Sequence, residues 1–395
     1  MRILRSLVPP ELGDRLVALR RDLHQHPELA FAEHRTASVL EREVAQLANV
    51  TVDRVGPTGL VARIPGARAG APVVAIRADI DALPIQEATE LPFASTTKGV
   101  MHACGHDIHA TWAVGAAALL RLEPAAGDVL IVFQPAEEIA EGARTMLASG
   151  CLADVRAIFG GHVDRRFTVG QVVAQDGPLA ASTDEFEIVL QGRGGHGARP
   201  HEAADPIVAL GAVITSLQTI VSRRVNPAKA GVVTIGMVSG GTASNVIPEQ
   251  VTLRGTLRAT DEETRSLLRS ELSEIATHAA AAHHVEARVA LLRELPPVIN
   301  SPEAAAWAAE AATAVLGADA VVPLTIANMA GEDFAFYLQS LQGCFLRIGA
   351  RRDGEPVIPA HSPQFDVAEE AIFVGAAVLA ESARRASAAL ANNDI

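Results

Sequence analysis

An unusual concentration of metal-binding side chains occupies residues 102–109. This stretch reads His-Ala-Cys-Gly-His-Asp-Ile-His, so one thiol and three imidazoles fall within eight positions. Sulfur and nitrogen donors suit a borderline divalent cation, and packing alone does not explain the tight Cys104-x-His106 spacing. Because cysteine binds metals only as thiolate, a cation here would displace the thiol proton. We therefore predict that Cys104 and His106 are metal ligands, and Cys104 could bridge two ions.

Two adjacent carboxylates follow a buried strand that we predict at residues 129–133. Glu137 and Glu138 end the segment Gln-Pro-Ala-Glu-Glu. Adjacent side chains on an extended backbone point in opposite directions, so one carboxylate can bind metal while the other faces a water molecule. Amide hydrolysis needs an activated water and a proton for the leaving nitrogen, which a metal and a carboxylate can provide together. Taken alone, such a pair is usually a solvated turn or the charge at a helix N-terminus, and the other motifs favour the metal site instead.

Two single histidines complete the candidate ligand set. His162 follows Ala-Ile-Phe-Gly-Gly, and His361 lies in Pro-Ala-His-Ser-Pro. Each alone could be a turn or core histidine. Nearby, Asp81 follows a predicted strand at 73–76 in the segment Asp79-Ile-Asp81, where it could orient a ligand or cap the next turn. The predicted metal ligands are Cys104, His106, Glu138, His162 and His361.

Two other classes of function compete with a metal hydrolase. Cys104 could be the nucleophile of a cysteine hydrolase, which alkylation would inactivate and chelators would not affect. Neither His102 nor His106 has an evident orienting partner in the sequence, which disfavours this alternative. A metal-binding or scaffolding protein without activity is the second alternative, but a pure binding site needs no free base such as Glu137.

Composition narrows the class of partner. The chain has 395 residues and a formal net charge of −13, without the lysine and arginine clusters that nucleic acid binding requires. The N-terminus lacks the apolar core of a signal peptide, and the longest apolar runs, near 110–120 and 371–380, are too short to span a bilayer. Three cysteines are too few for a disulfide framework. We expect a cytoplasmic protein with a small-molecule partner.

The first part of the chain alternates between helical and extended patterns. We predict strands at 59–64, 73–76, 129–133 and 157–161, with a helix at 108–122. The apolar, β-branched strands imply a parallel sheet, and each candidate ligand follows a strand. Open α/β sheets bind ligands at the carboxyl ends of their strands.

A different pattern begins after Gly177. Strands and helices are predicted in a β-α-β-β-α-β order, which is the ferredoxin-like arrangement. The chain is also longer than a single hydrophobic core usually organises, so the change of pattern indicates two domains. The expected organisation is a catalytic metal-binding domain in two parts, 1–177 and 293–395, with an inserted lid or dimerisation domain at 178–292.

The chain resembles the M20 metallopeptidase family over nearly its whole length. The resemblance is carried by Arg-Arg-Asp-Leu-His-Gln-His-Pro-Glu at 20–28, Arg-Ala-Asp-Ile-Asp-Ala-Leu-Pro, Met-His-Ala-Cys-Gly-His-Asp, Gln-Pro-Ala-Glu-Glu, Gly-Arg-Gly-Gly-His-Gly-Ala-Arg-Pro-His and His-Ser-Pro-Gln-Phe-Asp. These motifs match the amidohydrolase branch (subfamily D), which includes hippurate hydrolases, N-acyl-amino-acid amidohydrolases and auxin-conjugate hydrolases. The implied fold is a mixed-sheet α/β/α hydrolase domain with an inserted ferredoxin-like α+β domain.

The resemblance also implies roles for individual residues. Cys104 would bridge two divalent ions, and Glu137 would be the general base. His196, often supplied by the partner subunit in this family, would stabilise the oxyanion. Asn245 and Arg258 match positions that bind the substrate carboxylate.

The implied enzyme is a dinuclear metal-dependent amidohydrolase that cleaves N-acyl amino acids to a carboxylic acid and a free amino acid. Closure of its two domains, and therefore turnover, would depend on a hinge near Gly177 and Leu292. A dipeptidase, a carboxypeptidase or an N-carbamoyl-amino-acid hydrolase could use the same site. Ligand type does not rank zinc, manganese, cobalt and nickel. A homodimer through the inserted domain is expected from the family.

Overall fold

The computed structural model describes residues 2–393, and their contacts divide them into two compact units. Unit 1 comprises residues up to Gly177, Asn300–Thr325 and Phe336 onward, and unit 2 comprises Pro178–Ile299 and Ile326–Ala335. The first boundary follows Gly177, but the second falls seven residues beyond the predicted position 292. The reason is that strand β13 (Glu286–Leu295) continues on the sheet of unit 2. Residues 326–335 return to this unit because the backbone of Asn328 pairs with that of Leu179 and Ala181.

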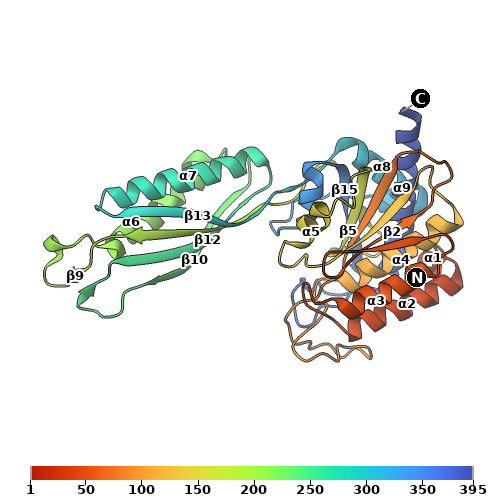
Figure 1. Cartoon of the computed structure of the whole chain (residues 1–395), viewed down its shortest axis with the longest axis horizontal. Helices are drawn as coiled ribbons and strands as arrows, with labels where there is room; N and C mark the ends of the chain where they lie inside the picture. The colour runs from red at the N-terminus through yellow and green to blue at the C-terminus, as the bar shows by residue number, and fades with distance from the viewer. Residues whose placement is uncertain (1, 394–395) are drawn as a thin grey trace. The chain divides into compact units, whose positions relative to one another are not determined.

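Unit 1 is built on a seven-stranded mixed sheet (Figure 1). The four central strands β4, β3, β5 and β15 are parallel, as the apolar runs predict, while β1, β2 and β6 pair antiparallel at the two edges. Parallel central strands that are buried on both faces explain the almost continuous apolar sequences. In sheet order the strands are β1 (Thr51–Val55), β2 (Gly59–Ile64), β4 (Val129–Gln134), β3 (Val73–Asp79), β5 (Val155–Thr168), β15 (Gln342–Arg351) and β6 (Val172–Val173).

Helices cover both faces of this sheet. Helices α4 (His106–Leu122) and α9 (Glu370–Asn393) pack against the central strands on one face, and α2 (Pro10–Gln25) packs on α4. The main core lies between these helices and the sheet, around the fully buried Trp112. The remaining helical segments of unit 1 are α1 (Arg2–Arg5), α3 (His34–Ala45), α5 (Gly142–Ala148), α8 (Pro302–Leu316) and η3 (Ala318–Ala320); η4 (Asp333–Gln339) spans a unit boundary.

Unit 2 has the predicted β-α-β-β-α-β order. Its antiparallel sheet runs β10 (Gly231–Gly240), β12 (Gln250–Ala259), β8 (Thr183–Gln191) and β13, which is the ferredoxin-like strand order. Helices α6 (Pro206–Thr219) and α7 (Glu262–Ala281) bury one face of this sheet in a separate apolar core. The short elements are η1 (Pro200–Glu202), the π-helical turn η2 (Ile220–Arg224), and the strand pairs β9 (Gly195–His196) with β11 (Val246–Ile247) and β7 (Gly177–Ala180) with β14 (Val298–Asn300).

One helical segment, Pro206–Arg224, is long and apolar enough to cross a membrane by length and composition alone. It includes α6, whose Val213 and Leu217 are buried in the core of unit 2. Other apolar side chains of α6 are exposed, namely Ile207 and Val208. The high hydropathy of this helix thus reflects two apolar faces, and only one of them is covered by its own sheet.

Candidate metal centre

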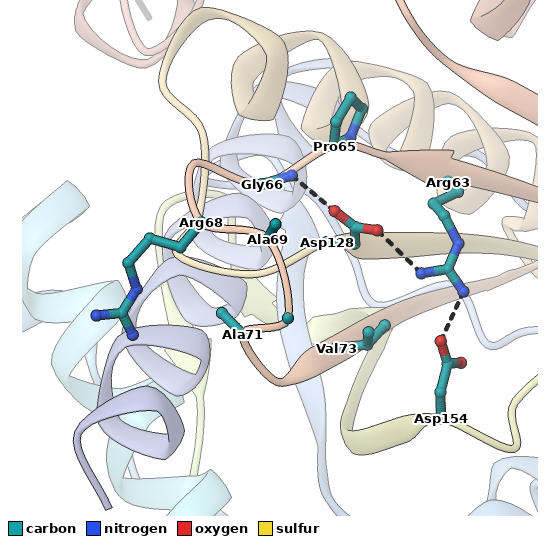
Figure 2. A pocket seen from close by; sticks show the side chains of 10 residues that line it. Arg63, Pro65, Gly66, Arg68, Ala69, Ala71, Val73, Asp128 and Asp154 are labelled. Carbon is teal, nitrogen blue, oxygen red and sulfur yellow. Dashed lines mark hydrogen bonds and ion pairs between the residues drawn. The ribbon is translucent and has the colours of Figure 1, made fainter. Parts of the chain in front are cut away.

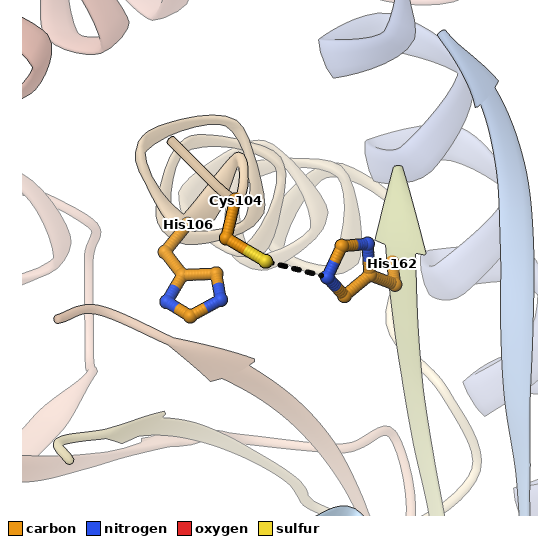
Figure 3. Close-up of side chains that lie close together, drawn as sticks. All are labelled: Cys104, His106 and His162. Carbon is orange, nitrogen blue, oxygen red and sulfur yellow. Dashed lines mark hydrogen bonds between the residues drawn. The ribbon is translucent and has the colours of Figure 1, made fainter. Parts of the chain in front are cut away.

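The structure brings the five predicted ligands together at the carboxyl end of the parallel strands in unit 1. Cys104 and His106 lie at the start of α4, on either side of Gly105, whose φ is +97°. A Cβ at Gly105 would lie 2.4 Å from the side chain of Val163, so this turn requires glycine. Figure 3 shows the thiol of Cys104 directed at the His162 ring, with the His106 ring beside it.

His162 lies inside β5, whereas the sequence predicted a strand that ends at residue 161, before His162. The parallel pairing of β5 with β3 ends at Gly160, while β5 continues beside β15 to Thr168. The effective end of the inner sheet therefore precedes His162 by two residues. This explains how a residue within a strand can still face the edge where the other ligands gather.

Two of the triplets of potential ligand atoms share one sulfur and together contain all five predicted ligands. The ligand atoms of Cys104, His106 and His162 lie within 4.8 Å of one another, and the same holds for Cys104, Glu138 and His361. The Sγ atom of Cys104 is 3.2 Å from Nε2 of His162, and Nε2 of His361 is 3.5 Å from Oε2 of Glu138. Such an arrangement has the donors for two ions bridged by a thiolate.

Unsatisfied buried atoms test whether these residues suit a metal. Among the described residues, Nε2 of His106 and Oε1 of Glu138 are buried without a hydrogen-bond partner, although they lie only 3.9 Å apart. Buried polar atoms normally have partners, and groups without one commonly face an ion or water. The mixed sulfur, nitrogen and oxygen donors fit borderline divalent cations. The residues present therefore fit a metal centre.

Asp81 contacts two of the candidate ligands, in agreement with the orienting position suggested by the sequence. Its Oδ1 atom is 3.2 Å from Nδ1 of His106, and its backbone oxygen is 2.9 Å from the same nitrogen. Its Oδ2 atom accepts a hydrogen bond from the backbone of Glu138. Because Nδ1 faces these oxygens, Nε2 of His106 is left to face the other ligands.

The turn that carries Glu137 and Glu138 is held in an unusual backbone conformation. Ala136, which precedes the pair, has φ +54°, and its oxygen accepts from the backbones of Glu141 and Gly142. A Cβ at Gly142 would lie 1.6 Å from the oxygen of Pro135, so only glycine allows this closure.

A buried carboxylate, Glu33, holds this turn from a distant part of the chain. Glu33 accepts hydrogen bonds from the Ala136 amide at 2.9 Å and from the Thr58 hydroxyl at 2.6 Å. Sequence reasoning missed Glu33, because a single glutamate 103 residues away from its partner leaves no local pattern.

Burial dominates the electrostatics of the site. It raises the pKa of the Cys104 thiol, and the neighbouring charge of Glu138 adds to this effect. Burial also raises the pKa of Glu138 to about 7, although the positive charge of His106 opposes the shift. It lowers the pKa of His162 well below its ordinary value, with the charges of His109 and Arg347 adding to the effect. Without a cation, the neutral forms of the Cys104 thiol and the His162 imidazole are therefore favoured. A bound cation would favour the Cys104 thiolate.

The motif at 20–28 supports the site from behind. Nδ1 of His24 lies 2.9 Å from the carboxylate of Asp107, which also accepts from Arg20. Glu28 accepts from the first backbone amides of α3 and so caps that helix. His26, which follows α2, has its Nδ1 atom 2.8 Å from the backbone oxygen of Asp22 and 3.5 Å from the Asp22 carboxylate. These contacts give the motif a structural role, and Asp107 is the neighbour of His106.

A separate hollow lies at the opposite ends of the strands (Figure 2). It is lined by Arg63, the 65–71 loop, Val73, Asp128 and Asp154. Arg63 is paired with Asp128 at 3.0 Å and with Asp154 at 2.7 Å, so its charge is neutralised. Since Val73 begins β3 and Asp79 ends it, this hollow is not the candidate metal centre.

Unit 2 brings His196 and Asn245 together. His196 pairs with Val246 between β9 and β11, and the amide of Gly197 donates to the oxygen of Asn245. The Nδ1 atom of His196 accepts from the backbone of Ala198. In the neutral ring the proton must then be on Nε2, which leaves an exposed donor of the kind that an oxyanion requires.

Arg258 lies on β12 of the four-stranded sheet, at the end away from the β9–β11 pair. It donates to the Thr183 hydroxyl and the Met329 oxygen, near the point where the chain enters unit 2. Arg258 is eight positions after Gln250 on β12, which is about 27 Å at the usual rise of a strand. His196 and Asn245 lie beyond the Gln250 end, because β9 and β11 follow there. Arg258 and Asn245 of one chain are therefore too far apart to hold one carboxylate.

Comparison with known proteins places these motifs in a family. The protein-family model described as Peptidase family M20/M25/M40 matches residues 75–385 of the chain. The chain is 43% identical to an N-acetylcysteine deacetylase of Bacillus subtilis, covering 93% of this chain and 96% of that protein. It is 38% identical to the IAA-amino acid hydrolase ILR1-like 5 of Arabidopsis thaliana, covering 94% and 86%.

A solved structure extends the likeness to three dimensions. The YXEP protein of Bacillus subtilis, described as a dinuclear metal binding peptidase from the M20 family, superposes with a TM-score of 0.86. It has 38% identity, and the match covers 96% of this chain and 99% of that one. The fold, the order of the motifs and the coverage agree, and the chain belongs to the M20 peptidase family.

Proposed function

We propose that the protein is a dinuclear metal-dependent amidohydrolase that cleaves N-acyl amino acids. The observation that carries the proposal is the pair of ligand triplets that share Cys104, with Glu137 beside them. Cys104, His106 and His162 would hold one ion, and Cys104, Glu138 and His361 would hold the other. When bound, the two ions would polarise an amide carbonyl and make water easier to deprotonate.

Glu137 is the proposed general base. Its Oε2 atom lies 4.0 Å from Nε2 of His106, so the carboxylate faces the ligand cluster without belonging to either triplet. It would take a proton from the attacking water and deliver it to the leaving nitrogen, which becomes the free amine. Asp81 would keep His106 and Glu138 in position through the contacts described above.

The substrate class rests on the relatives and on Arg258. N-acetylcysteine deacetylases and IAA-amino acid hydrolases, by their names, act on amides of amino acids. We expect an N-acyl amino acid whose carboxylate is held by Arg258, because a guanidinium binds carboxylates with two parallel hydrogen bonds. Burial lowers the pKa of Arg258, but an arginine remains charged at neutral pH.

We further propose a homodimer that forms through unit 2. Met237 and Val238 are exposed on the edge strand β10, while Ile207 and Val208 are exposed on α6. A Cβ at Gly241, which follows β10, would contact Ile207, so the helix and strand surfaces are continuous. Exposed apolar surface on an edge strand commonly pairs with another chain.

The dimer would resolve the separation of Arg258 from His196. Since most of the length of β12, about 27 Å, separates Arg258 from the end of the strand next to the β9–β11 pair that carries His196, the two residues cannot contact the same small molecule within one chain. His196 of the partner subunit would stabilise the oxyanion, and Asn245 of the partner subunit would accompany it. Val208→Lys combined with Met237→Lys should then yield a monomer in light scattering and abolish hydrolysis, while metal content stays unchanged. A fully active monomer would contradict this part of the proposal.

The test of the activity uses metal-free enzyme. After chelation and dialysis, the protein should hydrolyse neither N-acetylcysteine, N-acetylmethionine nor hippurate, and zinc, manganese, cobalt or nickel should restore activity to different extents. The same panel includes dipeptides and N-carbamoyl amino acids, which separate the alternative substrate classes. Full activity in the metal-free protein, together with inactivation by iodoacetamide, would instead identify Cys104 as a nucleophile.

The place of action proposed is the cytoplasm. All three cysteines, Cys104, Cys151 and Cys344, are free in the structure, which suits a reducing compartment. Fractionation of the native cells, followed with an antibody to the protein, tests this assignment.

A further inference from the structure

A buried carboxylate, Asp79, and its partners Arg77 and His109 lie next to the ligand cluster, and none of them belongs to the two triplets that share Cys104. The carboxylate of Asp79 is fully buried, with one oxygen 2.6 Å from Nδ1 of His109 and the other 2.5 Å from Arg77. His109 is itself fully buried on α4, where its ring stacks on Trp112 at a centroid distance of 4.5 Å. The position of the His109 ring is thus determined from two sides.

The hydrogen bonds of His109 assign its tautomer. A carboxylate that is paired with Arg77 accepts hydrogen bonds, so Nδ1 of His109 carries the proton and donates to Asp79. The Nε2 atom then has a lone pair, and it accepts a hydrogen bond from the backbone amide of Val163 at 3.0 Å. Asp79 therefore prepares His109 to hold one specific peptide group of β5.

The backbone of Val163 determines where His162 lies. Val163 follows His162, and its oxygen lies 2.6 Å from Nδ1 of the His162 ring. Val163 is consequently bound at its amide by His109 and at its oxygen by His162. The rings of His109 and His162 also meet edge to face at a centroid distance of 4.7 Å. The other ring nitrogen of His162 is the one near Cys104.

We propose that Asp79 and His109 form a positioning pair that determines how tightly one of the two ions, the one held by Cys104, His106 and His162, is bound. This inference rests on the proposed dinuclear function. The pair reaches His162 through Val163, and Asp79 lies 3.8 Å from Nε2 of His106, which belongs to the same triplet. The triplet of Cys104, Glu138 and His361 shares only the sulfur with it.

The experiment measures ion binding directly. Metal-free wild-type, Asp79→Asn and His109→Phe proteins are titrated with Co²⁺, followed by calorimetry and by the absorption of the thiolate-bound ion. Disturbing a residue that orients a metal ligand typically weakens binding about 10- to 100-fold. We expect this loss for one ion in both variants, with the second affinity within about twofold of wild type. Activity should return when the Co²⁺ concentration is raised.

A buried residue on the same helix provides the matched control. The hydroxyl of Thr111 donates to the oxygen of Asp107 and contacts neither His109 nor His162 by hydrogen bonding. Thr111→Val should retain both affinities. Asp79→Asn preserves side-chain shape, so it remains informative if His109→Phe fails to fold, which circular dichroism would reveal.

The outcomes separate this inference from the proposed function. A wild-type protein that binds fewer than two ions would overturn the proposed dinuclear site and this inference with it. If wild type binds two ions while Asp79→Asn binds both as tightly, or loses both equally, only the role of the positioning pair is overturned.

Discussion

The two units place their polar side chains in opposite ways. In unit 1 most of the charged and imidazole groups around the candidate centre are buried and connected, as with Asp79, Asp81 and His109, although the His361 side chain is 54% exposed. In unit 2 the candidate residues His196 and Asn245 are exposed on a short strand pair beyond the sheet. Burial in unit 1 means that the geometry exists before any ligand arrives. Because His196 and Asn245 in unit 2 are exposed, a substrate or a second protein surface would be needed to hold their side chains as precisely.

The two units also differ in what stabilises them. The core of unit 1 surrounds polar networks that cost energy to bury unless every member has a partner. Unit 2 has a simpler apolar core between two helices and a sheet, and its main buried ion cluster is at Asp184. Substitutions in unit 1 should therefore affect chemistry and metal binding first, whereas those in unit 2 should affect assembly, oxyanion stabilisation or local stability.

The largest effect is expected at Glu137. Glu137→Gln removes the proposed base but no ligand, so kcat should fall about 10²- to 10⁴-fold, the usual contribution of general acid–base catalysis. Metal content, measured by mass spectrometry of the ions, should not change. Glu138→Gln is the matched control, because the adjacent residue belongs to a ligand triplet and its loss should lower metal content. A metal-loaded and active Glu137→Gln protein would refute the assigned base.

The next effect is expected in unit 2. His196→Ala should lower kcat about 10²- to 10³-fold, as loss of one oxyanion donor does, with unchanged metal content and unfolding temperature. If His196 acts across the dimer, mixing this variant with Glu137→Gln creates one site in each mixed dimer that has both residues. Random exchange should then restore about a quarter of wild-type activity. No recovery in verified mixed dimers would assign His196 to its own subunit.

A third prediction concerns Asp184, which is fully buried and accepts hydrogen bonds from Arg265 and Arg269. Burial opposes ionisation, but the hydrogen bonds to these two arginines prevail and lower the pKa of Asp184 below its ordinary value. A carboxyl with a lowered folded-state pKa stabilises the fold above the unfolded value of about 3.9, and this stabilisation is lost as the pH falls through the folded-state pKa.

Asp184→Asn should therefore destabilise unit 2 by about 3 kcal/mol at pH 7, with a difference that shrinks below about pH 4. Hydrogen exchange of the α7 amides as a function of pH measures this locally. The exposed pair of Glu286 and Arg288 supplies the control, since Glu286→Gln should change exchange little at any pH. A difference that is independent of pH would show that packing, not charge, explains the effect of Asp184.

The sequence was informative wherever function or periodicity is local. Apolar runs predicted strands β3, β4 and β5, and the β-α-β-β-α-β order of elements after Gly177 predicted the ferredoxin-like unit. Cys104, His106 and Glu138 could be named because they lie in short stretches of uncommon composition, whereas His162 and His361 were supported only as members of the whole ligand set. These features depend on neighbours in the chain, so a single sequence contains them.

Features that depend on distant contacts were not predictable in this way. The edge strand β1 was missed, because its exposed residues lack an apolar alternation. The segment 326–335 gave no sign that it would join unit 2 through Asn328. Likewise, Asp79 gave no local sign that it would bind His109, 30 residues away, instead of a metal. Such pairings arise from the packing of whole elements.

The smallest expected effect tests another such distant contact. Glu33 is buried and holds the amide of Ala136, whose φ of +54° is unfavourable for a residue with a side chain. Glu33→Ala should release this turn and displace Glu137, so kcat should fall about tenfold while KM and metal content change little. Glu33→Gln can still accept from Ala136, and its amide can donate to Thr58, so its kcat should remain near wild type. If Glu33→Gln is as slow as Glu33→Ala, the charge of Glu33 matters more than its hydrogen bonds. If neither variant is slower, the turn holds its conformation through Gly142 alone, and unit 1 needs less support from distant residues than its buried contacts suggest.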